Sequence, residues 1–259
     1  MSFDPFWIKL LASFLVGGFY IGFVVVRSSE KFGSVFGGIL AGMPSTVLIS
    51  LIFIAWTQDT MAMWKAIPII PFGLSVSVIF LMFLVVFYKR SKFISFFGSL
   101  GIWLAILMPF VLKRVSDMWL LLGLAAIVLS VCITILKRFP GQKPPQLAPG
   151  RKESWFRFAV AGGIIALAVF LGKTAGPLWG GLIASFPAAT FSGIMLLINK
   201  HGSDFTISFV KGTAYGIVSN IGFLVLLYLL VPLWGIWAIF PALTLPVAFG
   251  LYKFLSLSR

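Results

Sequence analysis

The sequence predicts an all-α membrane protein with about nine transmembrane helices, arranged as two four-helix repeats of inverted topology joined by a central helix. Three observations lead to this fold class: an apolar composition, long uncharged segments that recur along the chain, and a motif that occurs twice. Of the 259 residues, 60% are hydrophobic and only 10% are charged; the mean hydropathy is +1.10. A water-soluble domain of this size could not bury so much apolar surface.

The apolar segments are long enough to be transmembrane helices, because about 20 residues span a hydrocarbon core of ~30 Å. They are continuously apolar, whereas barrel strands alternate polar and apolar residues over about ten positions. The first segment lacks a small-residue cleavage pattern, so we expect it to be retained rather than removed as a signal peptide. The predicted spans are residues 6–26, 34–56, 62–88, 93–112, 117–137, 156–172, 177–199, 205–231 and 233–255.

The basic residues predict the orientation of the chain. With the amino terminus outside, most of the 20 Lys and Arg residues fall in cytoplasmic loops, which is the usual bias of proteins in a cell membrane. The carboxyl terminus is then cytoplasmic, and the net charge of +14 needs no nucleic acid to explain it. The predicted parts are a first repeat over residues 1–112, a linking helix with a Pro- and Gly-rich cytoplasmic loop over 113–155, and a second repeat over 156–259.

A motif of small residues and proline occurs in both halves. The segments GSVFGGILAGMP (33–44) and GPLWGGLIASFP (176–187) share the pattern Gly-x3-Gly-Gly-x2-Ala-x2-Pro. An aspartate and then a lysine follow each motif, and one extra span separates the halves. The second half should therefore enter the membrane from the opposite side, as in the inverted repeats of many secondary transporters.

The motif predicts a tight helix crossing, a central binding site, or both. Glycines let helices pack closely, and each motif proline is expected to kink or break its span. On the binding-site hypothesis, freed backbone groups and nearby polar side chains line a cavity between the halves. The candidate substrate-binding residues are Pro44, Ser45, Thr46, Pro187, Thr190, Lys65, Lys211, Ser219 and Asn220.

The two lysines are included because an ionisable side chain within a membrane span is commonly functional. A lysine near a helix end can also extend to the interface, and for Lys65, beside Trp64, we favour that alternative. For Lys211 both alternatives stand. Ser219 and Asn220 lie deeper in the same span as Lys211, where they could bond to another helix or contact a substrate.

The acidic residues and the missing motifs limit the function. All six acidic residues lie in or beside predicted loops, so a cavity should be neutral to basic and suit an anionic or neutral polar solute or a lipid headgroup. One cysteine, Cys132, and one histidine, His201, cannot build a multi-residue Cys/His metal centre. No nucleotide-binding or nucleophile–base motif occurs. We therefore expect no catalytic, metal or cofactor site, no enzyme activity and no nucleic-acid partner.

The second motif and its continuation resemble the GlpM-like family of small four-helix membrane proteins. The residues that carry the resemblance are WGGLIASFPAAT (179–190), NKHG (199–202), Asp204 and Lys211. It covers roughly residues 156–255, with a weaker copy over 9–112, as though two such units were fused. The family has a link to alginate production in some bacteria and no established substrate. The drug/metabolite transporter superfamily also has inverted halves, but its typical five spans per half fit less well.

Two classes of function remain open from the sequence. The leading hypothesis is a secondary transporter or translocator of a solute or lipid, in contact with membrane lipids. The alternative is a non-transporting accessory or scaffold protein for envelope or polysaccharide biosynthesis, which would bind a membrane protein partner or form a homodimer through its small-residue helix faces. A channel is a third class, but no ring of charges or filter-like sequence supports it.

Overall fold

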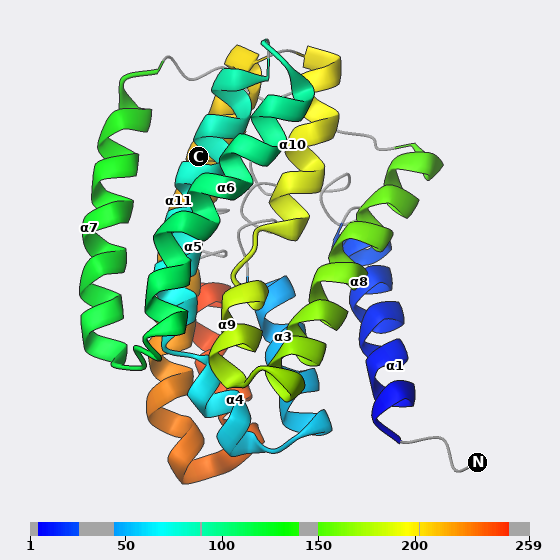
Figure 1. Ribbon diagram of the computed structural model, residues 1–259, viewed down its shortest axis with the longest axis vertical. Coiled ribbons are helices and arrows are strands. Elements are labelled where there is room, and N and C mark those ends of the chain that lie inside the picture. The colour runs from blue at the N-terminus through cyan, green and yellow to red at the C-terminus, as the bar shows by residue number, and fades with distance from the viewer. Residues whose placement is uncertain (1–4, 26–43, 89, 140–149, 202, 249–259) are drawn as a thin grey trace.

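The computed structural model describes residues 5–25, 44–88, 90–139, 150–201 and 203–248, and all regular structure within these ranges is helical (Figure 1). The elements are α1 (Pro5–Phe19), the π-helix η1 (Tyr20–Val25), α3 (Ser45–Thr57), α4 (Thr60–Ala66), α5 (Ile69–Phe87), α6 (Lys92–Leu112), α7 (Met118–Lys137), α8 (Arg151–Thr174), α9 (Pro177–Ala184), α10 (Ala188–His201), α11 (Ser203–Trp234), the 3-10 helix η2 (Gly235–Ala238) and α12 (Ile239–Ala242). The predicted all-α fold is confirmed for this part of the chain.

Seven segments of the described chain are long and apolar enough to cross a membrane, as in a multi-pass membrane protein. They are Pro5–Val24, Ile69–Phe87, Lys92–Leu112, Met118–Lys137, Arg151–Thr174, Pro177–Leu196 and Phe209–Ala248.

The difference from the predicted nine spans arises at two places. The first half of the predicted span 34–56 lies outside the described residues, and its second half is the short apolar helix α3. The single segment Phe209–Ala248 covers most of the last two predicted spans, 205–231 and 233–255, and residues 249–255 lie outside the described residues. That segment is interrupted at η2, where Gly235 has a φ of 56°, a left-handed conformation that glycine adopts without strain.

Helix α5 is the most enclosed of the candidate spans. In its apolar window 78% of the residues are buried, compared with 28% in α1, α6 and α7. The outward faces of the other helices carry large apolar side chains, among them Ile8, Phe93, Trp119, Leu233 and Trp237. Such a surface is unsuited to water but fits lipid. The molecule is therefore organised around α5.

A buried polar contact joins α5 to α6 and to the end of α9. The hydroxyl oxygen of Ser77 lies 2.8 Å from the carbonyl oxygen of Gly73 and 3.0 Å from that of Ser185, and it accepts a hydrogen bond of 3.0 Å from Trp103 Nε1. All these side chains are buried. Ser185 lies directly against Gly73, and a Cβ at position 73 would clash with the Ser185 hydroxyl. The close approach of these two residues therefore requires glycine at position 73.

The predicted close packing by the motif glycines is confirmed in the second half. A Cβ on Gly181 would clash with the carbonyl oxygen of Ala66, and one on Gly180 would lie 2.9 Å from the Cα atom of Gly172. The glycines hold α9 against α4 and α8. Their counterparts in the first motif, Gly37 and Gly38, lie outside the described residues.

Small residues also bring α1 and α8 together. A Cβ on Gly18 would lie 2.7 Å from the carbonyl oxygen of Phe158, and one on Gly162 would lie 2.6 Å from that of Phe14. These backbones approach as closely as in the small-residue crossings that are common between membrane helices.

Replacing Ser77 with alanine is expected to lower the free energy of unfolding by about 1–3 kcal/mol, because Trp103 Nε1 and the Ser185 carbonyl lose a buried partner. The matched control is Ser75→Ala, since Ser75 is equally buried on the same helix but bonds only to the Pro71 carbonyl of that helix. Unfolding of both variants in detergent measures the difference. Equal stability of the two variants would contradict this interpretation of the Ser77 contact.

Candidate functional site

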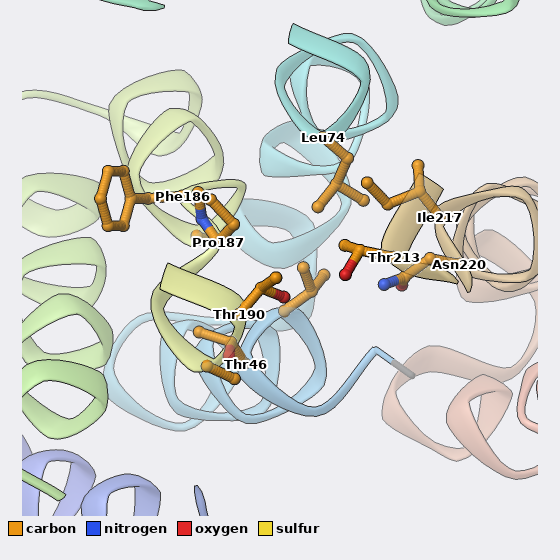
Figure 2. A pocket seen from close by; sticks show the side chains of 11 residues that line it. Thr46, Leu74, Phe186, Pro187, Thr190, Thr213, Ile217 and Asn220 are labelled. Atoms are coloured by element: carbon orange, nitrogen blue, oxygen red, sulfur yellow. The ribbon is translucent and has the colours of Figure 1, made fainter. Parts of the chain in front are cut away.

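A small cavity lies where α3, α5, α11 and the connection between α9 and α10 meet (Figure 2). Its volume is about 30 Å³. It is lined by Thr46, Val47, Leu74, Ala184, Phe186, Pro187, Ala189, Thr190, Thr213, Ile217 and Asn220.

The break between α9 and α10 forms one wall of the cavity. Helix α9 ends at Ala184, and α10 begins at Ala188, directly after Pro187. Proline has no backbone N–H and a fixed φ, so it is suited to the start of a helix and unsuited to its interior. The carbonyl of Pro187 accepts the first bond of α10, 2.7 Å from the nitrogen of Phe191. The predicted break at Pro187 is confirmed.

Helix α3 begins in the same way at the other motif proline. Pro44 directly precedes α3, and its carbonyl accepts a bond of 2.6 Å from the nitrogen of Leu48. No side chain caps this end of α3. The motif residues before Pro44 lie outside the described residues. For the first motif, the structure therefore describes only the start of the helix that follows it. Both helices that follow a motif proline therefore begin at the same cavity.

The polar side chains of the cavity come from three helices. Thr46 and Thr190 lie together at the starts of α3 and α10, and Thr213 and Asn220 face them from α11 (Figure 2). All four are buried. The Thr213 hydroxyl donates to the Phe209 carbonyl in its own helix at 3.1 Å. None of the described lining residues is charged, so their polar character comes from hydroxyl, amide and backbone groups.

The structure brings four of the predicted site residues together around the cavity: Thr46, Pro187, Thr190 and Asn220. Pro44 and Ser45 are buried and directly precede Thr46. Ser219 is half-buried beside Asn220 and does not line the cavity. The hydroxyl groups of Ser45 and Ser219 have no hydrogen-bond partner in the described part of the chain.

The two predicted lysines lie away from the cavity. Lys65 is exposed in the last turn of α4, where it can extend to the interface. Lys211 is half-buried on α11, two residues before Thr213, and does not line the cavity either. The described lining residues therefore include no ammonium group, and substrate contact by either lysine stays a prediction.

Sequence reasoning missed the polar residue Thr213 and several apolar ones. Thr213, Ile217 and Asn220 are spaced by four and three positions along α11, which places them on one helix face. That spacing could have extended the prediction from Asn220 to Thr213. Leu74 and Phe186 carried no such signal, because an apolar residue at a cavity looks the same in a sequence as one in the core.

A wider depression of about 430 Å³ lies near the α6–α7 connection. It is lined by Val111, Leu112, Arg114, Ala175, Gly176, Pro177, Leu178 and Trp179. The first residues of α9 line this depression, and the last residue, Ala184, lines the cavity. Helix α9, with eight residues and a length of about 12 Å, thus runs from the depression to the cavity.

No protein-family model, no curated protein and no solved structure matches this chain. The resemblance to the GlpM-like family accordingly stays a prediction that rests on the motif residues alone.

Proposed function

We propose that this protein is a secondary transporter or translocator of an anionic or neutral polar solute, and that the solute binds at the cavity between α3, α5, α10 and α11. The observation that carries the proposal is that two helices, each starting directly after a motif proline, meet at one cavity that is lined in part by threonine and asparagine side chains. Interrupted helices at matching places in two halves are the usual substrate sites of secondary transporters.

The proposal includes the nine-span arrangement with inverted halves, residues 1–112 and 156–259. Its support is the course of the two motif helices in Figure 1: α3 runs to α4 at the lower end of the molecule, whereas α9 and α10 run to the upper end. The close packing of α1 against α8 also fits, because these are the first helices of the two halves. Opposed directions let α3 and α10 meet at their N-termini.

Contacts between the proposed halves occur at both ends of the molecule. At one end the Tyr88 hydroxyl and Lys92 Nζ donate to Asn199 Oδ1, at 2.7 and 3.2 Å. At the other end the ring of Trp64 stacks on that of Tyr228 at 4.9 Å, and Trp64 Nε1 donates to the Tyr228 carbonyl. In alternating access, one set of contacts would break while the other holds.

The described residues that line the cavity carry no charge, and this supports an anionic or neutral polar solute. A carboxylate-based proton relay needs acidic side chains inside the membrane, and no acidic residue is among the described residues that line the cavity. The N-termini of α3 and α10 carry the positive ends of their helix dipoles. This environment favours an anionic or neutral polar solute over a cation.

Transport is tested with purified protein in liposomes. Wild type is expected to move at least one solute of a panel of small anions, neutral polar solutes and labelled lipids. Thr46→Val/Thr190→Val removes two cavity hydroxyls without changing side-chain volume, so the flux should fall roughly 5- to 30-fold, the equivalent of about 1–2 kcal/mol. Thr134→Val is the control, because Thr134 is exposed on α7 and bonds only within that helix.

If wild type moved no member of the panel, or if the double variant moved solute as fast as wild type, the transport proposal would fail. Co-purification of a stable membrane partner together with zero flux would favour the accessory or scaffold alternative.

The predicted orientation is tested by cysteine labelling in a Cys132→Ser background, which contains no other cysteine. An impermeant maleimide added to intact cells should label Ser116→Cys and Gly176→Cys, on loops that we place outside. Ser91→Cys, between α5 and α6, should react only after permeabilisation. Labelling of Ser91→Cys and Ser116→Cys from the same side of the membrane would contradict the proposed topology.

A further inference from the structure

We propose that the cavity binds a single small anion of about halide size, held between the N-termini of α3 and α10 by their backbone N–H groups and by the hydroxyls of Thr46 and Thr190. This inference rests on the proposed function and names the class of solute for the same site. It selects a monatomic anion over the organic anions, neutral solutes and lipid headgroups that the sequence left open.

The first support is that two helices begin at the cavity with no side-chain cap. The first N–H groups of a helix have no acceptor within the helix, and they lie at the positive end of its dipole. Pro44 provides no side-chain cap for α3, and the proline side chain at position 187 has no acceptor atom with which to cap α10. Of the first N–H groups of α10, that of Ala188 donates to the Phe186 carbonyl at 2.8 Å, so the N–H groups that follow it are the ones proposed to bind the anion. Since water is scarce in a membrane interior, N–H groups there favour a bound acceptor.

The second support is independent of the helix ends and lies in the side chains. Thr46 is 8% exposed and Thr190 is 4% exposed, and both line the cavity. Neither hydroxyl forms a hydrogen bond in the described part of the chain. Buried hydroxyls are normally hydrogen-bonded. Thr46 and Thr190 bring two such hydroxyls to one cavity from two different helices. A bound ligand that accepts a hydrogen bond from each of them explains this arrangement.

The size of the cavity decides between anions. A volume of about 30 Å³ exceeds the ~10–15 Å³ that one water needs on this measure, so a monatomic ion fits with the walls as they stand. Sulfate, phosphate, an organic carboxylate and a lipid headgroup are larger than such an ion. The apolar walls formed by Leu74, Phe186 and Ile217 keep the local dielectric low, which strengthens the attraction between the helix ends and an anion.

The sign of the charge follows from the surroundings. Among the described acidic side chains, those of Asp59, Asp117 and Glu153 each accept a backbone N–H bond at a helix start away from the cavity. None is available to coordinate a cation there, and a cation would face the positive ends of two helices.

The test measures anion binding by the purified full-length chain in detergent. Titration with chloride and bromide, at constant ionic strength balanced with gluconate, should raise the midpoint of thermal unfolding in a saturable manner, because a ligand that binds only the native state stabilises it. Sulfate should give no shift. In crystals soaked in bromide, anomalous scattering should locate one bromide between Thr46 and Thr190.

Thr46→Val and Thr190→Val should each weaken bromide affinity by about 5- to 10-fold. The conservative Thr190→Ser keeps the hydroxyl and should bind within about twofold of wild type, and Thr134→Val should match wild type. A wild-type protein with the same unfolding midpoint in bromide and gluconate would overturn the inference, as would valine variants that bind bromide with wild-type affinity.

Binding and transport can fail separately. Saturable bromide binding that depends on Thr190, with no flux of any solute in liposomes, would support the anion site and refute the transport proposal. Flux of another solute that depends on Thr190, with no binding of chloride or bromide, would support transport and refute the anion site.

Discussion

A helix that breaks in an apolar interior must find partners for the backbone groups that it frees, because no water is there to bond them. The break between α9 and α10 meets this constraint through the first half of the chain. The Ser185 carbonyl, at the end of α9, lies 3.0 Å from the hydroxyl of Ser77, which also accepts from Trp103. Gly73 leaves room for Ser185. The carbonyl freed at this break is therefore satisfied by α5, and the hydrogen bond from Trp103 links the same group to α6.

The same break creates the cavity. Because α10 begins as a new helix at Ala188, its first residues lie toward α3, which also begins directly after a proline. Thr46 and Thr190 are thereby brought to one small space that α11 closes with Thr213 and Asn220. The first residues of α9 line the wider depression. In the proposed transport cycle, displacement of this short helix would connect the depression with the cavity.

The sequence predicted the features that depend on local chemistry. Long apolar segments indicated the helices, and the missing N–H of Pro187 indicated the break. The contact of Ser77, Trp103 and Ser185 was not predictable, because it joins residues 26 and 108 positions apart and depends on how helices pack. Lys65 and Lys211 were predicted as site residues because of their charge. The position of a lysine ammonium group depends on how its helix is oriented, and the periodicity of the sequence alone does not give that orientation. The interruption at Gly235 depends on a left-handed φ that the composition does not show.

The central claim is that the starts of α3 and α10 face each other across one cavity. Cross-linking tests it most directly, with Thr46→Cys and Thr190→Cys introduced together in the Cys132→Ser background. Phe14→Cys with Phe158→Cys is the reference pair, since the rings of Phe14 on α1 and Phe158 on α8 are in contact, with centroids 5.3 Å apart. We expect the first pair to be joined by a disulfide or by a short bifunctional maleimide, as the reference pair is. Efficient cross-linking of the reference pair with none between positions 46 and 190 would contradict the account.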